Sequence, residues 1–303
     1  MRADGAVKKT DAFSSCHPIV NLIYFGLVIA FSMIFMHPVC LIISLACAFV
    51  YAVYLSGSAA LKLMLFCIPL MLFTAALNPL FSHAGQTVLT FLPSGNPLTL
   101  ESIIYGAASA VMLVSVILWF SCVNKIMTSD KLVYLFGRVI PAMSLTLSMT
   151  LRFVPRFVSQ FREVSNARKC LGFEGENAGT LRRIKNGLTV LSVMVTWSLE
   201  NAIETADSMK SRGYGLSARA AFSIYRFDRR DRVMLLWFIF IGAYVAVSGV
   251  LKAMSWQYFP TMRGTNLNIF SIGVYAAYLS LCLTPVAVDV MEERRWKSYQ
   301  LKI

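Results

Sequence analysis

Long apolar runs separated by short polar stretches form the dominant pattern of this chain. A helix needs roughly 20 mostly apolar residues to cross a bilayer, and six runs approach that length, at about 19–36, 39–55, 61–81, 100–123, 233–251 and 269–288. Between the fourth and fifth runs, mixed charge with helical periodicity replaces continuous apolarity. The pattern predicts three parts, namely residues 1–123 with an N-terminal tail and four spans, residues 124–232 with polar helices, and residues 233–303 with two spans and a tail.

Polar breaks indicate how the apolar runs are connected. His37-Pro38 separates the first two runs and predicts a helical hairpin. Pro69 lies inside the third run and predicts a kink, because its ring removes a backbone donor. Residues 82–100 contain Gly, Pro and Asn but no Lys or Arg. We expect them to form a loop on the translocated side of the membrane.

Two long helices are predicted in the central part. Pro141 opens the first helix at the position that proline favours. The second carries an amphipathic stripe with apolar residues at steps of three and four, namely Leu181, Ile184, Leu188, Leu191 and Val195. A glycine-rich break at 172–179 separates the helices, and each helix is expected to end near a glycine, Gly172 or Gly213.

Composition and charge support an all-α, polytopic membrane protein with about six spans. The chain is 57% hydrophobic and 14% charged, whereas a soluble domain has about a quarter of its residues charged. With six spans, 26 of the 28 Lys and Arg residues lie on one side, and only Lys252 and Arg263 lie on the other. The positive-inside rule then predicts a plasma-membrane protein with both termini cytoplasmic. Orientation and partner binding explain the basic central part without nucleic acid.

The chain lacks the sequence patterns of the common catalytic and cofactor sites. It contains no phosphate-binding G-x-x-x-x-G-K-[ST], no G-x-G-x-x-G and no H-E-x-x-H. His17, His37 and His83 are far apart in sequence, and the seven cysteines are scattered. We therefore expect no metal site, no cofactor and no ATP hydrolysis by this chain itself.

An acidic face on the second long helix leaves an alternative open. Glu200, Glu204 and Asp207 are spaced four and three residues apart, so they share one side of the helix. They fit a solvated or partner-facing edge, and also the carboxylates of a membrane-embedded enzyme. No nucleophile or metal ligand lies near them in the sequence, which favours the first interpretation.

Arg212 stands at the end of the second long helix. The helix dipole favours a guanidinium in the last turn, where it can form paired hydrogen bonds to a partner's carboxylates. Gly213 beside it allows the helix to end sharply. Both an ordinary helix terminus and a docking tip fit Ser211-Arg212-Gly213 on pattern alone.

Two stretches of the central part resemble a known family, the transmembrane T components of energy-coupling factor (ECF) transporters. The run Leu145 to Pro155, which includes Leu151-Arg152-Phe153-Val154-Pro155, is similar to the family's L-R-F-x-P helix. The run Ala206 to Tyr214 is similar to its A-D-x-x-x-x-R-G-[FY] ending, with Asp207 at the acidic position. The resemblance covers most of the chain and assigns Arg152, Pro155 and Asp207 to the structure of the coupling helices.

The resemblance implies two cytoplasmic coupling helices, each ending in an X-R-G motif that docks on one of two ABC-type ATPase subunits. Ser211-Arg212-Gly213 matches the second motif. The equivalent first triplet is Cys170-Leu171-Gly172, with leucine in place of arginine. Arg168 lies three residues earlier on the same helix face. We hypothesise that Arg168, or Lys169, supplies the missing charge.

The resemblance also implies a membrane-embedded, substrate-binding S component that rests on the coupling helices. Four apolar side chains are candidates for that contact, Met143, Leu147, Met194 and Met209, and they fit packing against the protein's own spans equally well. The implied function is energy coupling in the uptake of a vitamin or metal ion, whose identity depends on the S component. A conventional ABC importer permease, which binds substrate along its own spans, remains the main alternative.

Overall fold

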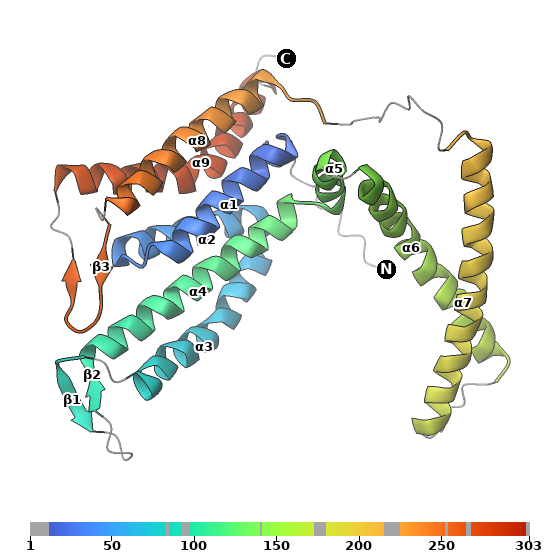
Figure 1. Ribbon diagram of the computed structural model, residues 1–303, viewed down its shortest axis with the longest axis horizontal. Helices are drawn as coiled ribbons and strands as arrows, with labels where there is room; N and C mark the ends of the chain where they lie inside the picture. The colour runs from blue at the N-terminus through green and yellow to red at the C-terminus, as the bar shows by residue number, and fades with distance from the viewer. Residues whose placement is uncertain are drawn as a thin grey trace. The chain divides into compact units, whose positions relative to one another are not determined.

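The chain folds into two compact units. The computed structural model describes residues 12–82, 85–91, 97–139, 141–172, 180–214, 225–251, 254–264 and 268–300. The first unit comprises Met1–Thr128 and Tyr225–Ile303, and the second comprises Ser129–Ile224. Helices dominate the described part of both units (Figure 1).

The helices of the first unit follow the apolar runs. Their bounds are α1 Pro18–Ile34, α2 Pro38–Ser56, α3 Ser58–Phe81, α4 Leu100–Ile126, α8 Arg229–Val250 and α9 Ile269–Gln300. All except α1 are long and apolar enough to cross a membrane, whereas α1 is apolar but has only 17 residues. The prediction of an all-α, polytopic membrane protein is confirmed, and the first of the six predicted spans is the shortest. The helix at the third run continues through Pro69 without a break.

Histidine–proline pairs begin the first two helices. His17 and His37 occupy the N-cap positions of α1 and α2, and each is followed by a proline in the first turn. The Nδ1 atom of each histidine accepts a backbone hydrogen bond at 3.3 Å, from Ile19 and Val39 respectively. Because proline has no N–H, the imidazole satisfies the next free donor of the helix.

Aromatic side chains form the core that joins the spans. Trp119 of α4 is fully buried, and its ring centroid lies 6.2 Å from that of Tyr24 in α1 and 6.4 Å from that of Tyr51 in α2. Polar atoms in this core find partners across helices. The Trp119 indole N–H donates to the Ser44 hydroxyl at 3.1 Å, and the Tyr24 hydroxyl donates to the Cys282 carbonyl at 3.2 Å. Such bonds remove the cost of burying polar groups.

Two short antiparallel hairpins lie in residues 82–100 and in the Gly-, Pro- and polar-rich stretch between the last two apolar runs, both of which the sequence predicts as loops. β1 (Val88–Phe91) pairs with β2 (Pro97–Thr99), and β3 (Trp256–Gln257) pairs with β4 (Arg263–Gly264). The loop prediction was wrong for these strands, because they are too short to show a clear alternation of apolar and polar residues.

Three helices make up the described part of the second unit. They are α5 (Ser129–Val139), α6 (Pro141–Cys170) and α7 (Thr180–Ser211). The two long helices were predicted with their ends, whereas α5 was not predicted. The glycine-rich break at 173–179 lies outside the described residues.

Candidate functional site

Side-chain contacts join α6 and α7 into an antiparallel pair. The ring centroids of Phe157 and Trp197 lie 5.3 Å apart, and the Arg156 guanidinium carbon lies 5.7 Å from the Trp197 ring centroid. Further along, the Arg168 guanidinium donates to the Asn186 side-chain oxygen at 3.2 Å. The contact that lies later in α6 involves a residue that lies earlier in α7, so the two helices run in opposite directions. The pair therefore has a fixed register at two separate levels.

This register places the two helix ends far apart along α7. Extending the 157–197 and 168–186 pairing by one turn sets Gly172 level with residue 182. At about 1.5 Å per residue, Gly213 then lies about 45 Å further along the α7 axis. Two such ends are too widely separated to act as one small site.

A glycine in the left-handed region closes α7. Gly213 has φ 78°, its N–H donates to the Lys210 carbonyl at 3.0 Å, and the Tyr214 N–H donates to the Met209 carbonyl at 3.0 Å. These two bonds form a Schellman motif, which satisfies the last carbonyls of the helix. The preceding Arg212 and Ser211 are exposed. The second predicted tip is thus a sharply capped helix end that carries an exposed arginine.

The end of α6 has a similar backbone but different side chains. Gly172 has φ 75°, and its N–H donates to the Lys169 carbonyl at 3.0 Å. Leu171 is 71% exposed, and Cys170 and Lys169 are also exposed. Arg168 is half-buried against Asn186 of α7. This cation links the two helices, and Leu171 is the apolar residue exposed at the tip.

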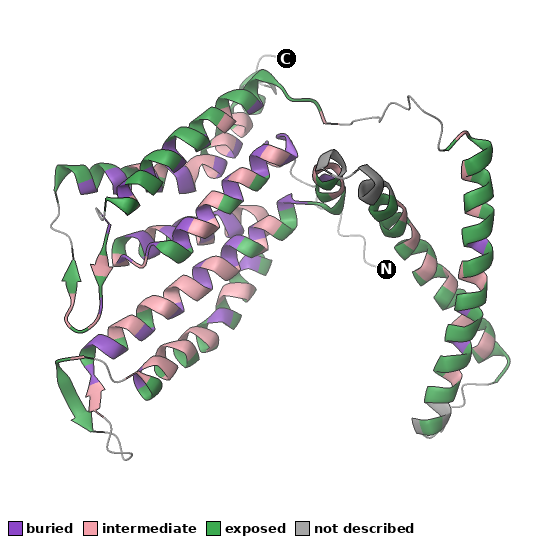
Figure 2. Cartoon of the chain, viewed as in Figure 1, coloured by how far each residue is buried: buried purple, intermediate pink, exposed green. Residues whose placement is uncertain are grey.

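The apolar stripe predicted on α7 is exposed to the surroundings. Its members are between 50% and 87% exposed, and Leu199 and Ile203 extend it at 62% and 65%. Val190 and Met194 are buried at 4% and 7%, on the side that carries Trp197. Figure 2 shows how little of this unit is buried. The stripe lies on roughly the opposite side of α7 from the residues that face α6, since each residue advances the helix by about 100°.

The structure separates the four candidates for the S-component contact. Leu147 is 38% exposed on α6, and Met209 is half-buried. Met194 is buried, so its side chain offers little surface to a partner. The side chain of Met143 lies outside the described part of the chain. A helical stripe alone did not tell which apolar face would be covered, because both faces of α7 carry apolar residues.

Other predicted residues lie on the exposed surface of the helix pair. Arg152 and Pro155 are exposed on α6, and Asp207 is exposed on α7, where Glu200 and Glu204 are exposed too. No group of three or more His, Cys, Asp or Glu side chains that could hold a metal ion occurs among the described residues. Six of the seven cysteines are buried, and Cys170 is exposed.

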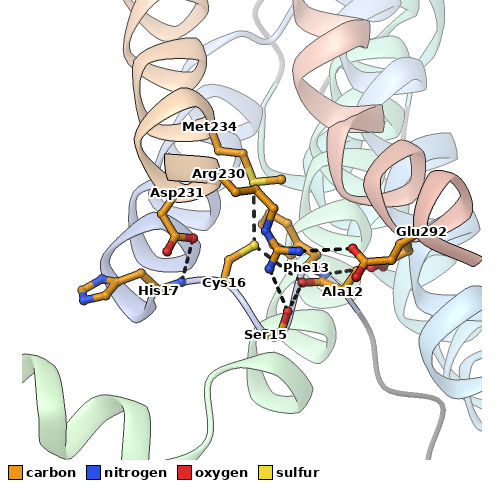
Figure 3. Close-up of polar contacts among 10 residues, drawn as sticks. Ala12, Phe13, Ser15, Cys16, His17, Arg230, Asp231, Met234 and Glu292 are labelled. Atoms are coloured by element: carbon orange, nitrogen blue, oxygen red, sulfur yellow. Dashed lines mark hydrogen bonds and ion pairs between the residues drawn. The ribbon is translucent and has the colours of Figure 1, made fainter. Parts of the chain in front are cut away.

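A polar clasp at the start of α8 was not predicted. We use the term N-terminal clasp for residues 12–17 together with Arg230, Asp231, Asp289 and Glu292 (Figure 3). The Phe13 N–H donates to Asp289 Oδ1 at 2.8 Å, and the His17 N–H donates to Asp231 Oδ1 at 3.1 Å. Both carboxylates are buried, and Phe13 is fully buried beside them.

Arg230 completes the N-terminal clasp on its exposed side. Its guanidinium donates to the Ser15 hydroxyl at 2.9 Å and forms an ion pair with Glu292 at 3.1 Å. Asp231 also accepts the Asp228 N–H at 3.2 Å, within a capping box that begins α8. The clasp joins three distant stretches at the point where the chain re-enters the first unit. Asp228-x-x-Asp231 before an apolar run is a capping signal that is visible in the sequence.

Comparison with known proteins identifies the family. A family model for cobalt transport proteins, CbiQ, matches residues 13–222, which is more than half of the chain. The chain belongs to this family. It is a multi-pass protein of a transport family, and the prediction of a resemblance to ECF T components is confirmed.

Curated relatives agree with the family match over shorter stretches. The ECF transporter transmembrane protein EcfT of Lactobacillus helveticus is 29% identical over 108 residues, which cover 35% of this chain and 39% of that protein. EcfT of Lacticaseibacillus paracasei is 32% identical over 92 residues, covering 30% and 35%. An uncharacterized protein of Mycoplasma genitalium is 24% identical over 159 residues, covering 48% and 38%. The matches thus span about two fifths of the length of these relatives.

Proposed function

We propose that this chain is the scaffold and energy-coupling subunit of an ECF-type ABC importer for a vitamin or a metal ion. The observation that carries the proposal is the α6–α7 pair, with two glycine-capped, cation-bearing ends about 45 Å apart along α7. A subunit that connects two separate ATPases to one substrate-binding partner needs such distant contact points on a stiff element. Two long helices that contact each other at two levels provide that stiffness.

Each helix end docks on one ABC-type ATPase subunit. At the second end, Arg212 projects beside Gly213 and reaches carboxylates or carbonyls in a groove of the ATPase. At the first end, the docking segment is Arg168 to Gly172. Leu171 adds an apolar contact there, and Arg168 or Lys169 supplies the charge. The bond from Arg168 to Asn186 supports a second task for Arg168, which is to hold the first tip against α7.

The exposed stripe on α7 receives the S component. Its seven apolar side chains, from Leu181 to Ile203, follow a continuous line along the helix. An apolar line of this length on a helix pair with few buried side chains favours a hydrophobic partner. Leu147 and Met209 extend the same contact at its edges. The bilayer surrounds the first unit, with both termini in the cytoplasm.

The proposed mechanism is mechanical. ATP binding and hydrolysis in the two ATPases move the tips, and α6 and α7 carry that motion to the S component, which releases its solute. The N-terminal clasp fixes the start of α8, where the chain returns from the second unit to the first. The chain is therefore anchored at this position. This chain makes and breaks no covalent bond in the process, and it needs no cofactor of its own.

Affinity purification of the tagged chain in mild detergent tests the proposal. We expect two ATPase chains and one small hydrophobic protein to purify with it, and the transported solute to bind only when the small protein is present. If the isolated chain binds the solute by itself, the conventional ABC permease is correct instead. If alanine at Glu200, Glu204 and Asp207 abolishes a catalytic activity of the chain alone, an enzyme is correct.

A further inference from the structure

The first span ends before the spans around it. The hydrogen bond from the His17 backbone N–H to the Asp231 carboxylate sets the starts of α1 and α8 at about the same level. From that level, the 17 residues of α1 rise only about 25 Å, at about 1.5 Å per residue, whereas the hydrocarbon core of a bilayer is about 30 Å thick. From Asp231 to Val250, α8 rises about 28 Å, so it ends only about 3 Å beyond α1. After Ile34 the helix ends, and Phe35 and Met36 lie with the last turn of α8 around one cavity.

An apolar cavity lies where α1 ends. It has a volume of about 610 Å³. Its walls come from the end of α1 and the chain that follows, from the end of α8, and from the stretch before the β3–β4 hairpin, with residues such as Phe31, Ile34, Ala246, Val250, Met254 and Trp256. Ser255 is the only polar residue among those that line it. Water gains few hydrogen bonds in such a space.

The cavity is built by specific packing. The Phe35 ring lies so close to α8 that a Cβ at Gly249 would come within 2.4 Å of it, so only glycine permits this approach. The Tyr258 hydroxyl donates to the Met36 carbonyl at 2.7 Å, and the ring of Trp256 lies 5.2 Å from that of His37 in an edge contact. These contacts hold the β3–β4 hairpin over the end of α1.

The side chains around the opening of the cavity indicate which kind of molecule binds there. Ile34 and Val250 are 67% and 82% exposed, so apolar side chains of two membrane-embedded helices flank the cavity. Trp256 also lines it, and tryptophan favours the level where hydrocarbon meets the headgroups. A cavity at this depth with apolar flanks is open to lipid tails rather than to a water-soluble ligand.

We propose that this cavity is a binding site for one acyl chain of a phospholipid. The acyl chain fills the cavity where α1 ends, and its headgroup lies near the β3–β4 hairpin. Burial of its methylenes against Phe31, Phe35 and Met254 holds it more firmly than lipid at the open faces of α3 or α8. The site does not depend on the transport function.

Fluorescence of Trp256 tests the proposal directly. The full chain is placed in phosphatidylcholine bilayers whose acyl chains carry bromine, which quenches tryptophan on contact, and the Trp256 signal is taken as the difference from a Trp256→Phe variant. Ala246→Phe fills the cavity, and we expect it to lower the quenching of Trp256 by about half or more, because a well-packed ring leaves no room for the chain. Ala243→Phe, one turn earlier on an exposed position of α8, is the matched control and leaves quenching unchanged.

Two quenching results would contradict the acyl-chain site. If Ala246→Phe and Ala243→Phe give the same quenching, or if aqueous iodide quenches Trp256 while brominated lipid does not, the cavity holds no acyl chain. Ala246→Leu provides a milder filling variant, so that a folding defect in Ala246→Phe does not decide the result. A count of lipid phosphate per purified protein gives a second reading, in which Ala246→Phe retains less lipid than Ala243→Phe.

Discussion

The two units of this protein differ most in how much of their apolar surface they cover themselves. The first unit buries large aromatic side chains, with Trp119, Tyr24, Tyr51 and Tyr278 at 0% exposure. In the second unit Val190 and Met194 are the buried hydrophobic residues among those described, while residues such as Leu181, Leu188 and Ile203 are more than half exposed. The first unit completes its own core. The second leaves most of the large apolar side chains that the structure describes exposed.

A charge removed at the second tip gives the largest expected effect. Arg212→Ala should weaken association with an ATPase subunit by about 30-fold or more, because losing one partner of a buried interface charge pair costs several kcal/mol. Pull-down of the ATPases and uptake by whole cells measure this. Lys210→Ala is the matched control, since it removes an exposed cation of the same helix turn. Equal losses in both variants would mean that only overall charge matters at this tip.

A charge placed on the exposed stripe of α7 tests whether a partner covers that face. Leu188→Glu should lower recovery of the small membrane partner by at least about tenfold, because a buried leucine contributes about 2 kcal/mol and a carboxylate adds a desolvation cost. The ATPases should still purify with the variant. Thr189→Glu places the same charge on an exposed position of α7 that is about 100° around the helix from Leu188 and off the stripe. If the small partner remains with Leu188→Glu, the stripe contacts something else.

Loss of a buried carboxylate should destabilise the first unit. Asp231→Ala leaves the N–H groups of His17 and Asp228 without their acceptor, so we expect the free energy of unfolding to fall by about 1–3 kcal/mol. Arg230→Ala, which removes a half-exposed ion pair in the same clasp, should cost only about 0–1 kcal/mol. Thermal unfolding of the purified protein measures both. A larger loss in Arg230→Ala would show that the clasp depends on its exposed side.

The smallest expected effect separates two roles of Arg168. If this residue docks on an ATPase, Arg168→Ala should weaken association by about tenfold or less, since a single hydrogen bond contributes about 1 kcal/mol. Asn186→Ala, which removes only the acceptor on α7, should then leave association unchanged. Equal weakening in both variants would show that Arg168 positions the tip instead. If Arg168→Ala has no effect while Arg212→Ala abolishes docking, the substitution hypothesis fails.

The sequence predicted the elements that depend on local chemistry. Apolar length gave the spans, proline and glycine gave the starts and ends of the long helices, and Gly172 and Gly213 adopt the left-handed backbone expected of helix caps. The short strands and α5 were not predicted, because a few residues give too little periodicity for a reliable pattern. The roles of Arg168, Leu171 and Arg212 in docking stay predictions.

Contacts between distant stretches decided the rest. The sequence showed an amphipathic stripe on α7 but not whether α6 would cover it, and α6 packs on the other side, which carries Val190, Met194 and Trp197. Asp289 directly follows the last predicted apolar run, at about 269–288, whereas α9 continues to Gln300 and the buried carboxylate accepts the Phe13 N–H. Local propensity fixes where a helix runs, since its hydrogen bonds are internal. Only tertiary packing fixes which side chains face each other. Packing between distant stretches joins the N-terminal clasp, leaves the stripe on α7 exposed and forms the cavity beside the short first span.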